Sequence, residues 1–436
     1  MKKIKNLFGI FFLTFLFICT VPTVVETVSW LKEYYFQRYD STMRKYNTRY
    51  YQPAEIINRS VYARQKEVLS QTFPSKEKDY SPAYIWKKIC QALLSLPERK
   101  NFEEQLVEAF PFRIIFTEIS MAFRKTIGMK VPVEYSRHYL RPDGSFGLLP
   151  IEENQSFPLE RIFNAEKSAR KVKAEFHVVV RPNNIPNVYT GNYRGLPDHY
   201  TRHLNSRIRQ LEKAGISVWD MRKQWEQLPN RSGLFFRTDH HWNVYGALEG
   251  ARILAAMLNE NYRLDYDLKR FDPRYFQKIR FKNIFLGSGG KTLTIEYAED
   301  AKTEDFDILL PAFKTDFSLY TSSKYFNRGD FSVFLFPDKW NYNFYQTNPY
   351  AIWLNGDEAE VRIVNHLIPQ RKRKKILFIK DSFSISMIPY LALQTGEIYM
   401  VDPRERNDAK IQKIIEREKP DFVLWGFSLI TLMNWN

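Results

Sequence analysis

The sequence predicts an α/β protein built on a three-layer parallel sheet, with a β-rich insertion and a membrane-anchor helix near its amino terminus. Short β-prone runs alternate with helical patterns from residue 176 to about 258, and again from residue 376 onward. Between these regions, residues from about 259 to 370 break the pattern with alternating, aromatic-rich segments. With 436 residues and 44% apolar content, the chain can bury the core of one large or two ordinary domains, which excludes overall disorder.

An amino-terminal apolar run predicts a signal anchor at residues 1–29. Lysines among the first five residues precede an uncharged run over residues 7–25, close to the ~20 residues that a helix needs to cross a bilayer. No small-x-small cleavage site follows the run, so we expect an uncleaved anchor rather than a cleaved signal peptide. The lysines favour a cytoplasmic amino end and an extracytoplasmic remainder, at the cell surface or in the periplasm. Cys19 lies in the run, and Cys90 is the only cysteine outside it, so no disulfide can form within the exported part.

The chain is strongly basic, with a formal net charge of +16. Its basic residues are scattered, and no helix-turn-helix, zinc-finger or RNP pattern is present, so we expect no nucleic-acid partner. An exported basic domain is expected to meet anionic lipid headgroups, wall polymers or an acidic polysaccharide. We interpret the run Arg371–Lys375 as a solvated approach to a buried strand, with a polymer-binding patch as the alternative.

Residues 30–99 are aromatic and charged, and include a helical stretch at Ser81–Leu96. They carry no readable chemistry, so we interpret them as a juxtamembrane helical stalk. A long helical pattern then begins at Phe102, and Asp143-Gly144 has the signature of a hairpin turn.

A βαβ pattern follows. His177–Val180 is expected to be a buried strand, Thr201–Ala214 a helix and Gly215–Val218 a second strand that leads to Trp219-Asp220. A polar loop and a helix from Tyr245 to Leu258 complete this region.

The loop before that helix holds an acid, two histidines and an indole: Asp239, His240, His241 and Trp242. A carboxylate can orient an imidazole and stabilise its charge, and the imidazole then serves as a general base. We expect Asp239 and His241 to form such a pair. His240 is the second candidate for the base or a supporting residue, and Trp242 is expected to pack and shape the loop rather than touch substrate.

The region of about 259–370 is expected to be a β-rich insertion. Its alternating segments include Gly287–Gly290, Lys291–Tyr297 and Asp330–Phe336. The aromatic stretch Trp340–Tyr345 could stack on sugar rings, although buried β packing is the reading that we favour.

The carboxy-terminal region returns to alternating strands and helices. The expected elements are the strand Ile376–Ile379, a helix reaching about Gln394, the strand Glu397–Val401, the helix Ala409–Glu418 and an extended segment from Pro420 to Ser428. Asp381 and Ser382 follow the first of these strands. Because open α/β sheets build active sites at the carboxyl ends of their strands, Ser382 is the candidate nucleophile.

Aspartate and serine often do no more than cap helices. Taken together, however, the runs Thr238–Asn243 and Lys380–Ser384 resemble the DHHW proteins, relatives of the periplasmic alginate O-acetyltransferases. The phrase Phe110–Arg113, followed by the Asp-Gly turn, is similar to the entry of their catalytic domain.

The resemblance implies that residues 100–436 form a circularly permuted domain similar to an SGNH hydrolase. In such hydrolases the serine strand opens the fold, whereas here the acid-histidine loop precedes it. Two departures from that pattern stand out. Ser428 occupies the place of the asparagine that helps to form the oxyanion hole, and the acid and base are spaced as Asp-x-His, which agrees with the acetyltransferase relatives.

The function that the resemblance implies is polysaccharide O-acetylation in the bacterial cell envelope, through Ser382, His241 and Asp239. The backbone N–H of Ser382 and the side chain of Ser428 are the expected oxyanion donors. An acetylated donor, a polysaccharide acceptor and a membrane acyltransferase of the MBOAT type are the implied partners, and no cofactor is expected.

Two other functions remain open: a carbohydrate acetyl esterase, and a non-catalytic envelope assembly or polymer-binding protein. A metal site built on Asp239, His240 and His241 is disfavoured. Adjacent histidines rarely point at one ion, and no Cys or His partner stands at ligand spacing.

Overall fold

The computed structural model describes residues 138–140, 145–148, 159–182, 199–229, 231–293, 303–336 and 348–427, and positions 121, 124 and 126. The predicted anchor at 1–29, the stalk at 30–99, and the segments Phe102–Arg113 and Trp340–Tyr345 lie outside the described residues. Within the described part, no helix is both long and apolar enough to cross a bilayer.

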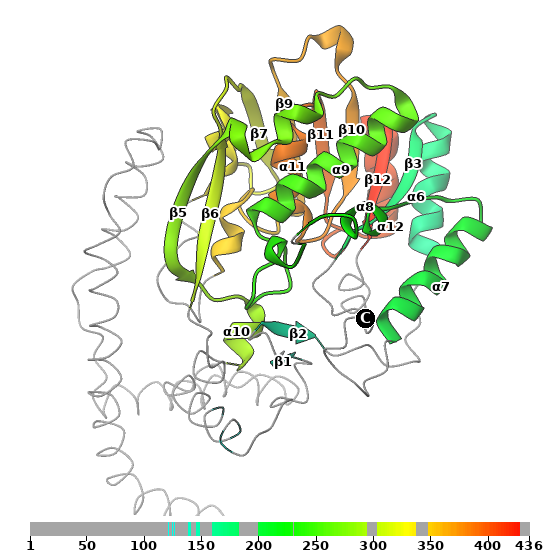
Figure 1. Ribbon diagram of the computed structural model, residues 1–436. Coiled ribbons are helices and arrows are strands. Elements are labelled where there is room, and N and C mark those ends of the chain that lie inside the picture. The colour runs from blue at the N-terminus through cyan, green and yellow to red at the C-terminus, as the bar shows by residue number, and fades with distance from the viewer. Residues whose placement is uncertain are drawn as a thin grey trace, which may run out of the picture. The chain divides into compact units, whose positions relative to one another are not determined.

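A mixed sheet of eight strands lies at the centre of the described part (Figure 1). Its strands are β3 (Glu175–Val180), β4 (Ser217–Asp220), β7 (Phe317–Thr321), β8 (Phe326–Gly329), β9 (Glu360–Asn365), β10 (Lys375–Ile379), β11 (Glu397–Val401) and β12 (Phe422–Phe427). Their order across the sheet is β4-β3-β12-β10-β11-β9-β7-β8. The five strands from β4 to β11 are parallel, and the remaining three are antiparallel.

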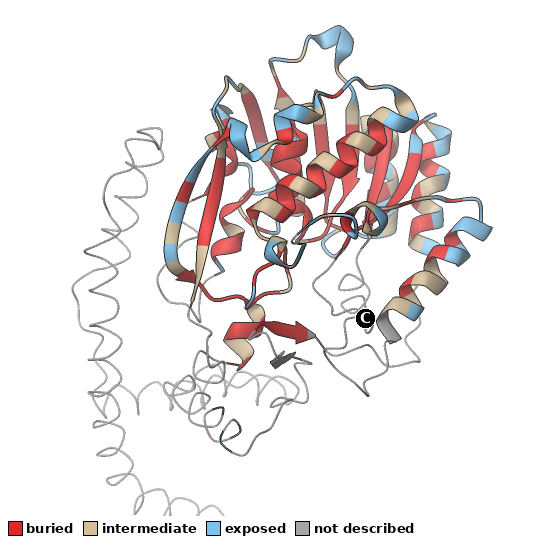
Figure 2. Cartoon of the chain, in the orientation of Figure 1, coloured by how far each residue is buried: buried red, intermediate tan, exposed pale blue. Residues whose placement is uncertain are grey.

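Helices cover both faces of the sheet. They are α6 (Glu160–Lys171), α7 (His199–Lys213), α9 (Val244–Tyr262), α11 (Ser384–Leu391) and α12 (Asp408–Glu418). Apolar side chains of α6, α7 and α12 pack against alternate residues of β3, β10, β11 and β12. Helices α9 and α11 cross the opposite face (Figure 1), and the strands between the two layers are buried almost throughout (Figure 2). The α/β class and the large sheet are therefore as predicted, but the sheet is mixed rather than wholly parallel, because β9, β7 and β8 join it in antiparallel register.

The individual elements agree closely with the sequence pattern. Strand β11 coincides with the expected strand, and the boundaries of α7, α9 and α12 differ from expectation by a few residues. Helix α12 begins at its Asn407 cap and ends at Lys419, which adopts a left-handed conformation directly before Pro420. Helix α6 and the single turn α8 (Arg222–Trp225) were not predicted.

The region expected to be an insertion is only partly separate from the main sheet. Strands β7, β8 and β9 extend that sheet, whereas β5 (Phe276–Phe285) and β6 (Glu304–Pro311) form a two-stranded antiparallel ribbon.

Two segments that we interpreted as alternating strands are helical. Residues Ser288–Leu293 form α10, so the expected strand at Lys291 is wrong at its beginning. Residues Phe331–Phe334 form a 3-10 helix that Asp330 caps. Phe331, Val333 and Phe334 are all buried, so their alternation with serine did not reflect one buried and one exposed face.

A short hairpin precedes the main domain elements. Strands β1 (His138–Leu140) and β2 (Phe146–Leu148) pair in antiparallel register on either side of Asp143-Gly144, so the predicted hairpin is confirmed by its flanks. The Phe146 N–H donates a 2.6 Å hydrogen bond to the Arg237 carbonyl, which ties β2 to the loop that carries the acid and histidines.

Candidate active site

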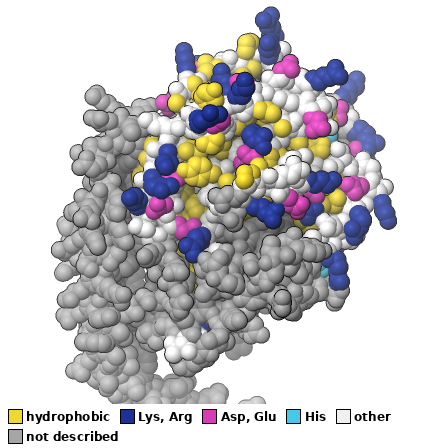
Figure 3. All heavy atoms as spheres, in the orientation of Figure 1, with side chains coloured by type: hydrophobic (Ala, Val, Ile, Leu, Met, Phe, Trp, Pro, Cys, Tyr) yellow, Lys and Arg dark blue, Asp and Glu magenta, His cyan; other side chains and the backbone are white. Residues whose placement is uncertain are grey.

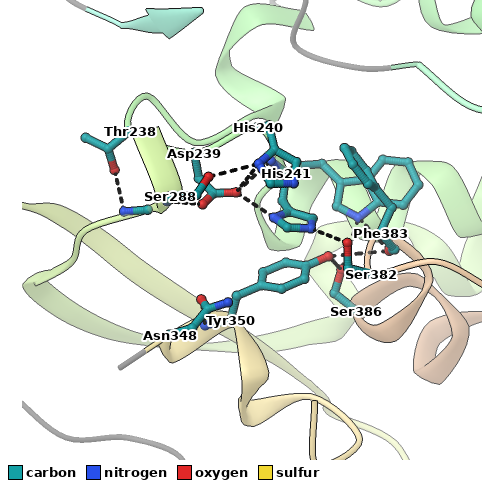
Figure 4. Close-up of polar contacts among 12 residues, drawn as sticks. Thr238, Asp239, His240, His241, Ser288, Asn348, Tyr350, Ser382, Phe383 and Ser386 are labelled. Atoms are coloured by element: carbon teal, nitrogen blue, oxygen red, sulfur yellow. Dashed lines mark hydrogen bonds and ion pairs between the residues drawn. The ribbon is translucent and has the colours of Figure 1, made fainter. Parts of the chain in front are cut away.

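The structure brings Asp239, His241 and Ser382 together in one hydrogen-bonded chain (Figure 4). Asp239 Oδ1 lies 2.5 Å from His241 Nδ1, and His241 Nε2 lies 2.7 Å from Ser382 Oγ. The loop before α9 supplies the first two residues, and the turn between β10 and α11 supplies the serine. A carboxylate, an imidazole and a hydroxyl in this order form an acid-base-nucleophile arrangement.

Asp239 is buried, and each of its oxygens has a partner. Oδ1 also accepts the His241 backbone N–H at 2.9 Å, and Oδ2 accepts the Ser288 backbone N–H at 2.6 Å. Burial acts to raise the pKa of Asp239, but the charges of His240 and His241 and these hydrogen bonds outweigh it. The net effect is a pKa well below the usual range, so the carboxyl group is ionised at any working pH.

The loop is held in place by the ribbon β5–β6 and the turn that follows β5. The Glu304 carboxylate accepts hydrogen bonds from the backbone N–H groups of Arg237 and Thr238 and from the Thr238 hydroxyl, at 2.6–2.7 Å. The Gly290 N–H donates to the Thr238 carbonyl at 2.9 Å. Sequence analysis missed Glu304 and Ser288, although the glycines from 287 to 290 are a signal of close backbone approach.

Trp242 is fully buried and joins the loop to the serine turn. Its Nε1 donates to the Phe383 carbonyl at 3.1 Å and to the Ser386 hydroxyl at 3.0 Å. A Cβ on Gly250 of α9 would lie 2.9 Å from the indole, and a Cβ on Gly246 would lie 2.2 Å from the Leu234 carbonyl oxygen and 2.7 Å from the Trp242 Cβ, so Gly250 leaves space for the indole and Gly246 lets the loop backbone approach α9. Trp242 therefore packs between α9 and the serine turn, as expected.

Asn243 begins helix α9. Its Oδ1 accepts the N–H groups of Tyr245 and Gly246, the arrangement of an N-terminal helix cap. The cap places the first residue of the helix, Val244, three residues after His241, and so fixes the direction in which the chain passes from the loop into α9.

His240 lies beside the pair, with its ring nitrogen directed at Ser288 rather than at Ser382. Its Nδ1 is 2.9 Å from Ser288 Oγ and 3.6 Å from Asp239 Oδ1, and its ring lies against that of His241 at 3.9 Å between centroids. His241 rather than His240 is thus placed to act as base. One potential metal-ligand atom from each of Asp239, His240 and His241 lies within 4.8 Å of the others, but Asp239 and His241 already share a hydrogen bond there.

A buried ion pair supports the serine turn. The guanidinium of Arg181, directly after β3, pairs with the Asp381 carboxylate and donates to the Ser384 hydroxyl at 2.9 Å. Asp381 Oδ1 in turn accepts the Phe383 N–H at 3.0 Å. Sequence analysis did not identify Arg181, whose only signal is a charge directly after a buried strand.

Lys380 forms a second buried pair at the same edge of the sheet. Its Nζ lies 2.8 Å from Asp402 Oδ2, between the carboxyl ends of β10 and β11, and both side chains are fully buried. The residues on either side of Ser382 in the Lys-Asp-Ser-Phe-Ser run are therefore fixed by contacts with neighbouring strands.

Of the two expected oxyanion donors, the structure describes only the backbone N–H of Ser382. Ser428 lies outside the described residues. Among the described residues, the backbone N–H of Ser382 has no hydrogen-bond acceptor, whereas those of Phe383 and Ser384 are both bonded to Asp381.

Comparisons with known proteins give one family match and several similar solved structures. A family model described as the SGNH hydrolase-like domain of the acetyltransferase AlgX matches residues 189–275, which include Asp239 and His241 but not Ser382. No curated protein matches the chain.

Several solved structures are similar. PatB1 of Bacillus cereus, solved with a sulfonyl adduct, is 16% identical with a TM-score of 0.53, over 68% of this chain and 94% of PatB1. A DHHW family protein of Eubacterium siraeum is 15% identical with a TM-score of 0.48, over 66% of this chain and 88% of that one. The O-acetyltransferase domain of Pseudomonas putida AlgJ is 15% identical with a TM-score of 0.42, over 69% of this chain and 93% of that one.

The likeness to PatB1 shows a common fold. Residues 189–275, which hold the acid-histidine loop, match the model of the SGNH hydrolase-like domain of AlgX, in agreement with the resemblance that the two motifs predicted.

Proposed function

We propose that this protein is an O-acetyltransferase of the bacterial cell envelope that acts on polysaccharide hydroxyls through Ser382, His241 and Asp239. The observation that carries the proposal is the hydrogen-bond chain from Asp239 through His241 to Ser382. The match to an acetyltransferase domain over residues 189–275 supports acyl transfer as the reaction class.

In the proposed mechanism, His241 Nε2 takes the proton of Ser382 Oγ as that oxygen attacks the carbonyl carbon of an acetyl donor. Asp239 stabilises the imidazolium that forms. The leaving group takes the proton from His241, which leaves an acetyl ester on Ser382. A sugar hydroxyl then attacks this ester with His241 again as base, and the proton returns to Ser382.

The negative oxygen of each tetrahedral intermediate needs hydrogen-bond donors. The unbonded N–H of Ser382 is the first donor in this proposal, and the Ser428 side chain remains the candidate for the second. Losing one such donor typically raises the barrier by ~3 kcal/mol.

We also propose that the fold is a circular permutation of the SGNH arrangement. If β10 is counted as the first strand, the parallel strands β11-β10-β12-β3-β4 read 2-1-3-4-5, an order found in doubly wound α/β folds. Counted in this way, the serine follows the first strand and the acid-histidine loop follows the last.

The test is to incubate the purified full-length protein with a chromogenic acetyl ester, with and without oligosaccharide acceptors. We expect the ester to be cleaved faster with the oligosaccharide acceptor than without it, and the acetylated oligosaccharide to be the product. Free acetate alone would favour the esterase, since water can replace the sugar hydroxyl at the same site. An absence of turnover with either would leave a non-catalytic assembly or polymer-binding protein.

We further propose that the apolar run at residues 7–25 anchors an extracytoplasmic domain, and that an MBOAT-type membrane acyltransferase supplies the acetyl group. Lys and Arg side chains are spread over the face in Figure 3, with Asp and Glu among them. Such a surface suits diffuse attraction to anionic polymers or lipid headgroups. On cells from which any outer membrane has been removed, added protease should digest the part after Trp30, and complete protection of that part would contradict the proposed orientation.

A further inference from the structure

Tyr350 lies flat against the candidate base. Its ring centroid is 4.3 Å from that of His241, and the two planes are inclined by only 22° (Figure 4). Tyr350 belongs to a short 3-10 helix, Pro349–Ile352, within the region that we expected to be a β-rich insertion. The tyrosine is buried, so the stacked pair is shielded from water.

The tyrosine ring is fixed at both ends. Its hydroxyl shares a 2.7 Å hydrogen bond with the Ser386 hydroxyl and lies 3.4 Å from the Phe383 carbonyl. Trp242 Nε1 donates to the same two groups. At the backbone, Asn348 caps the 3-10 helix by accepting the Tyr350 N–H. The network that holds the serine turn therefore also holds the aromatic face under His241.

The position of this face suits a stacked cation. During acyl transfer His241 must become an imidazolium, and the face of an aromatic ring attracts a cation, most strongly where water is excluded. Burial keeps the pKa of Tyr350 well above its usual value, so the phenol stays neutral. Asp239 meets the edge of the imidazole at Nδ1, whereas Tyr350 meets its flat face, so the two contacts are distinct.

We propose that Tyr350 is a positioning residue for the base: its ring holds the imidazole of His241 in the plane that joins Asp239 to Ser382, and stabilises the imidazolium formed during transfer. This inference rests on the proposed role of His241 as base. It adds one requirement to the chemistry of Ser382, His241 and Asp239: an aromatic ring must lie against the imidazole of the base.

Other charged groups near His241 stay in place in the variants that test this. Asp239 and the ring of His240 approach from the loop, while Asp381 and Arg181 approach Tyr350 from the ends of β10 and β3. None of them bonds the tyrosine hydroxyl in the described structure. Tyr350→Leu removes both the ring contact and the hydroxyl's contacts with Ser386 and Phe383, whereas Tyr350→Phe removes only the hydroxyl's contacts, so the comparison of the two variants isolates the ring.

The experiment uses a reaction that needs Ser382 and His241 but no natural substrate. In the full-length protein, a small alkylsulfonyl fluoride is attacked by Ser382 Oγ: the O–S bond forms, the S–F bond breaks, and His241 takes the serine proton before releasing it to water. The rate of this labelling is measured over a pH series, with the modified serine identified by mass spectrometry.

Tyr350→Leu should lower the plateau rate about tenfold and move the acidic limb of the pH–rate profile to lower pH by up to about one unit, because the imidazolium loses its stacking partner. Tyr350→Phe should keep the wild-type limb, since the face remains. The matched control is Tyr390→Leu. Tyr390 is also buried, and its hydroxyl donates to the Leu309 carbonyl. Its ring, however, packs against the rings of Phe276, Phe331 and Trp353 rather than against His241.

A second series keeps the shape of the side chain. Phenylalanine with successive ring fluorines at position 350 weakens the negative face at nearly constant volume, and the limb should move to lower pH step by step. An unmoved limb in both Tyr350→Leu and the fluorinated series, or an equal shift in Tyr390→Leu, would overturn the inference.

The outcomes also separate this inference from the proposed function. If wild-type Ser382 is labelled and Tyr350 behaves as expected, but no polysaccharide is acetylated, the inference stands and the transferase proposal fails. If wild-type Ser382 takes no sulfonyl group, both fail together.

Discussion

Asp239, His241 and Ser382 share two hydrogen bonds, so the contribution of each side chain depends on the other two. Ser382→Ala and His241→Ala should each reduce acetyl-ester turnover by more than about 1,000-fold, and combining them should add little. Asp239→Ala should be milder, because the imidazole remains as a base without its orienting partner. Turnover of the chromogenic ester and acetylation of polysaccharide are the measurements.

His240→Ala is the control for these variants, since it changes the adjacent residue without touching the serine, and it should lose far less activity. The assignment would be contradicted by an inactive His240→Ala protein beside an active His241→Ala protein. Normal acetylation by Ser382→Ala would place the catalyst in another protein.

Arg181 offers a prediction about stability. Arg181→Met removes the guanidinium that pairs with the buried Asp381 carboxylate, and breaking a buried pair by removing one member typically costs ~3–5 kcal/mol of unfolding free energy. Urea denaturation followed by fluorescence is the measurement. Arg170→Met is the matched control, because Arg170 pairs with Glu166 on the exposed side of α6, and a surface pair contributes about 1 kcal/mol or less. Equal losses in the two variants would contradict a special role for the pair at the serine turn.

At the scale of secondary-structure elements, glycines determine how closely the loop, the turn after β5 and helix α9 approach. Gly246 and Gly250 stand one helical turn apart on α9; Gly246 makes room for the Leu234 carbonyl and the Trp242 Cβ, and Gly250 for the Trp242 indole. Gly287 does the same for the acid, since a Cβ there would lie 2.6 Å from Asp239 Oδ2.

Gly287→Ala should therefore displace the Asp239 carboxylate and lower ester turnover roughly as far as Asp239→Ala does. Gly215→Ala is the contrasting variant. Gly215 has a φ of +78° in the turn before β4, and a Cβ there would meet nothing within 4 Å. It should cost about 1 kcal/mol of stability and leave turnover unchanged. Ester kinetics and thermal unfolding of both variants distinguish the two effects, and an active Gly287→Ala protein would show that the turn can yield.

These elements also show what the sequence could predict. The periodicity of α7, α9, α12 and the buried strands is local, so it indicated their type and nearly their ends. The contacts of Glu304, Ser288 and Tyr350 with the loop join segments about 50 to 110 residues apart, and no local pattern encodes such a partner. The strand prediction for residues 331–334 is wrong because Phe331, Val333 and Phe334 are all buried, so their spacing does not mark one buried and one exposed face of a strand.

At the scale of the whole molecule, one buried histidine makes stability depend on pH. His177 on β3 bonds the hydroxyls of Ser217 and Tyr262 and stacks on Trp219 at 4.0 Å. Burial lowers the pKa of His177 from 6.5 to about 4. Between these values the unfolded chain takes up a proton that the folded protein excludes.

Its contribution is therefore fully present above pH 6.5 and is lost as the pH falls toward 4, by up to about 3 kcal/mol. The measurement is urea denaturation of the wild type and of His177→Gln over this pH range. The unfolding free energy of His177→Gln should depend less steeply on pH, by the amount that corresponds to about one proton taken up on unfolding. Identical slopes would mean that other groups dominate the acid response.

The site as a whole was predictable to the extent that two sequence motifs carried it. The residues Asp239, His241 and Ser382 were visible because each stands in a polar run beside an apolar, periodic element. Their meeting follows from the order of strands, in which β3 and β4 lie beyond β12 from the serine strand β10. That order is a property of the complete sheet, and Ser428 and the residues near it remain predictions.

The central place of β12 has a consequence for the time at which the protein becomes functional during synthesis. In the sheet, the strands nearest the acid-histidine loop and the strands nearest the serine are joined only through β12, which is the last described strand to leave the ribosome. A nascent chain stopped at Lys419 already contains all three residues of the site, yet it lacks the strand that sets them side by side. Until then β3 and β10 both present open backbone edges, which are prone to pair with other chains. Delayed completion therefore leaves the chain open to aggregation until its last strand is made.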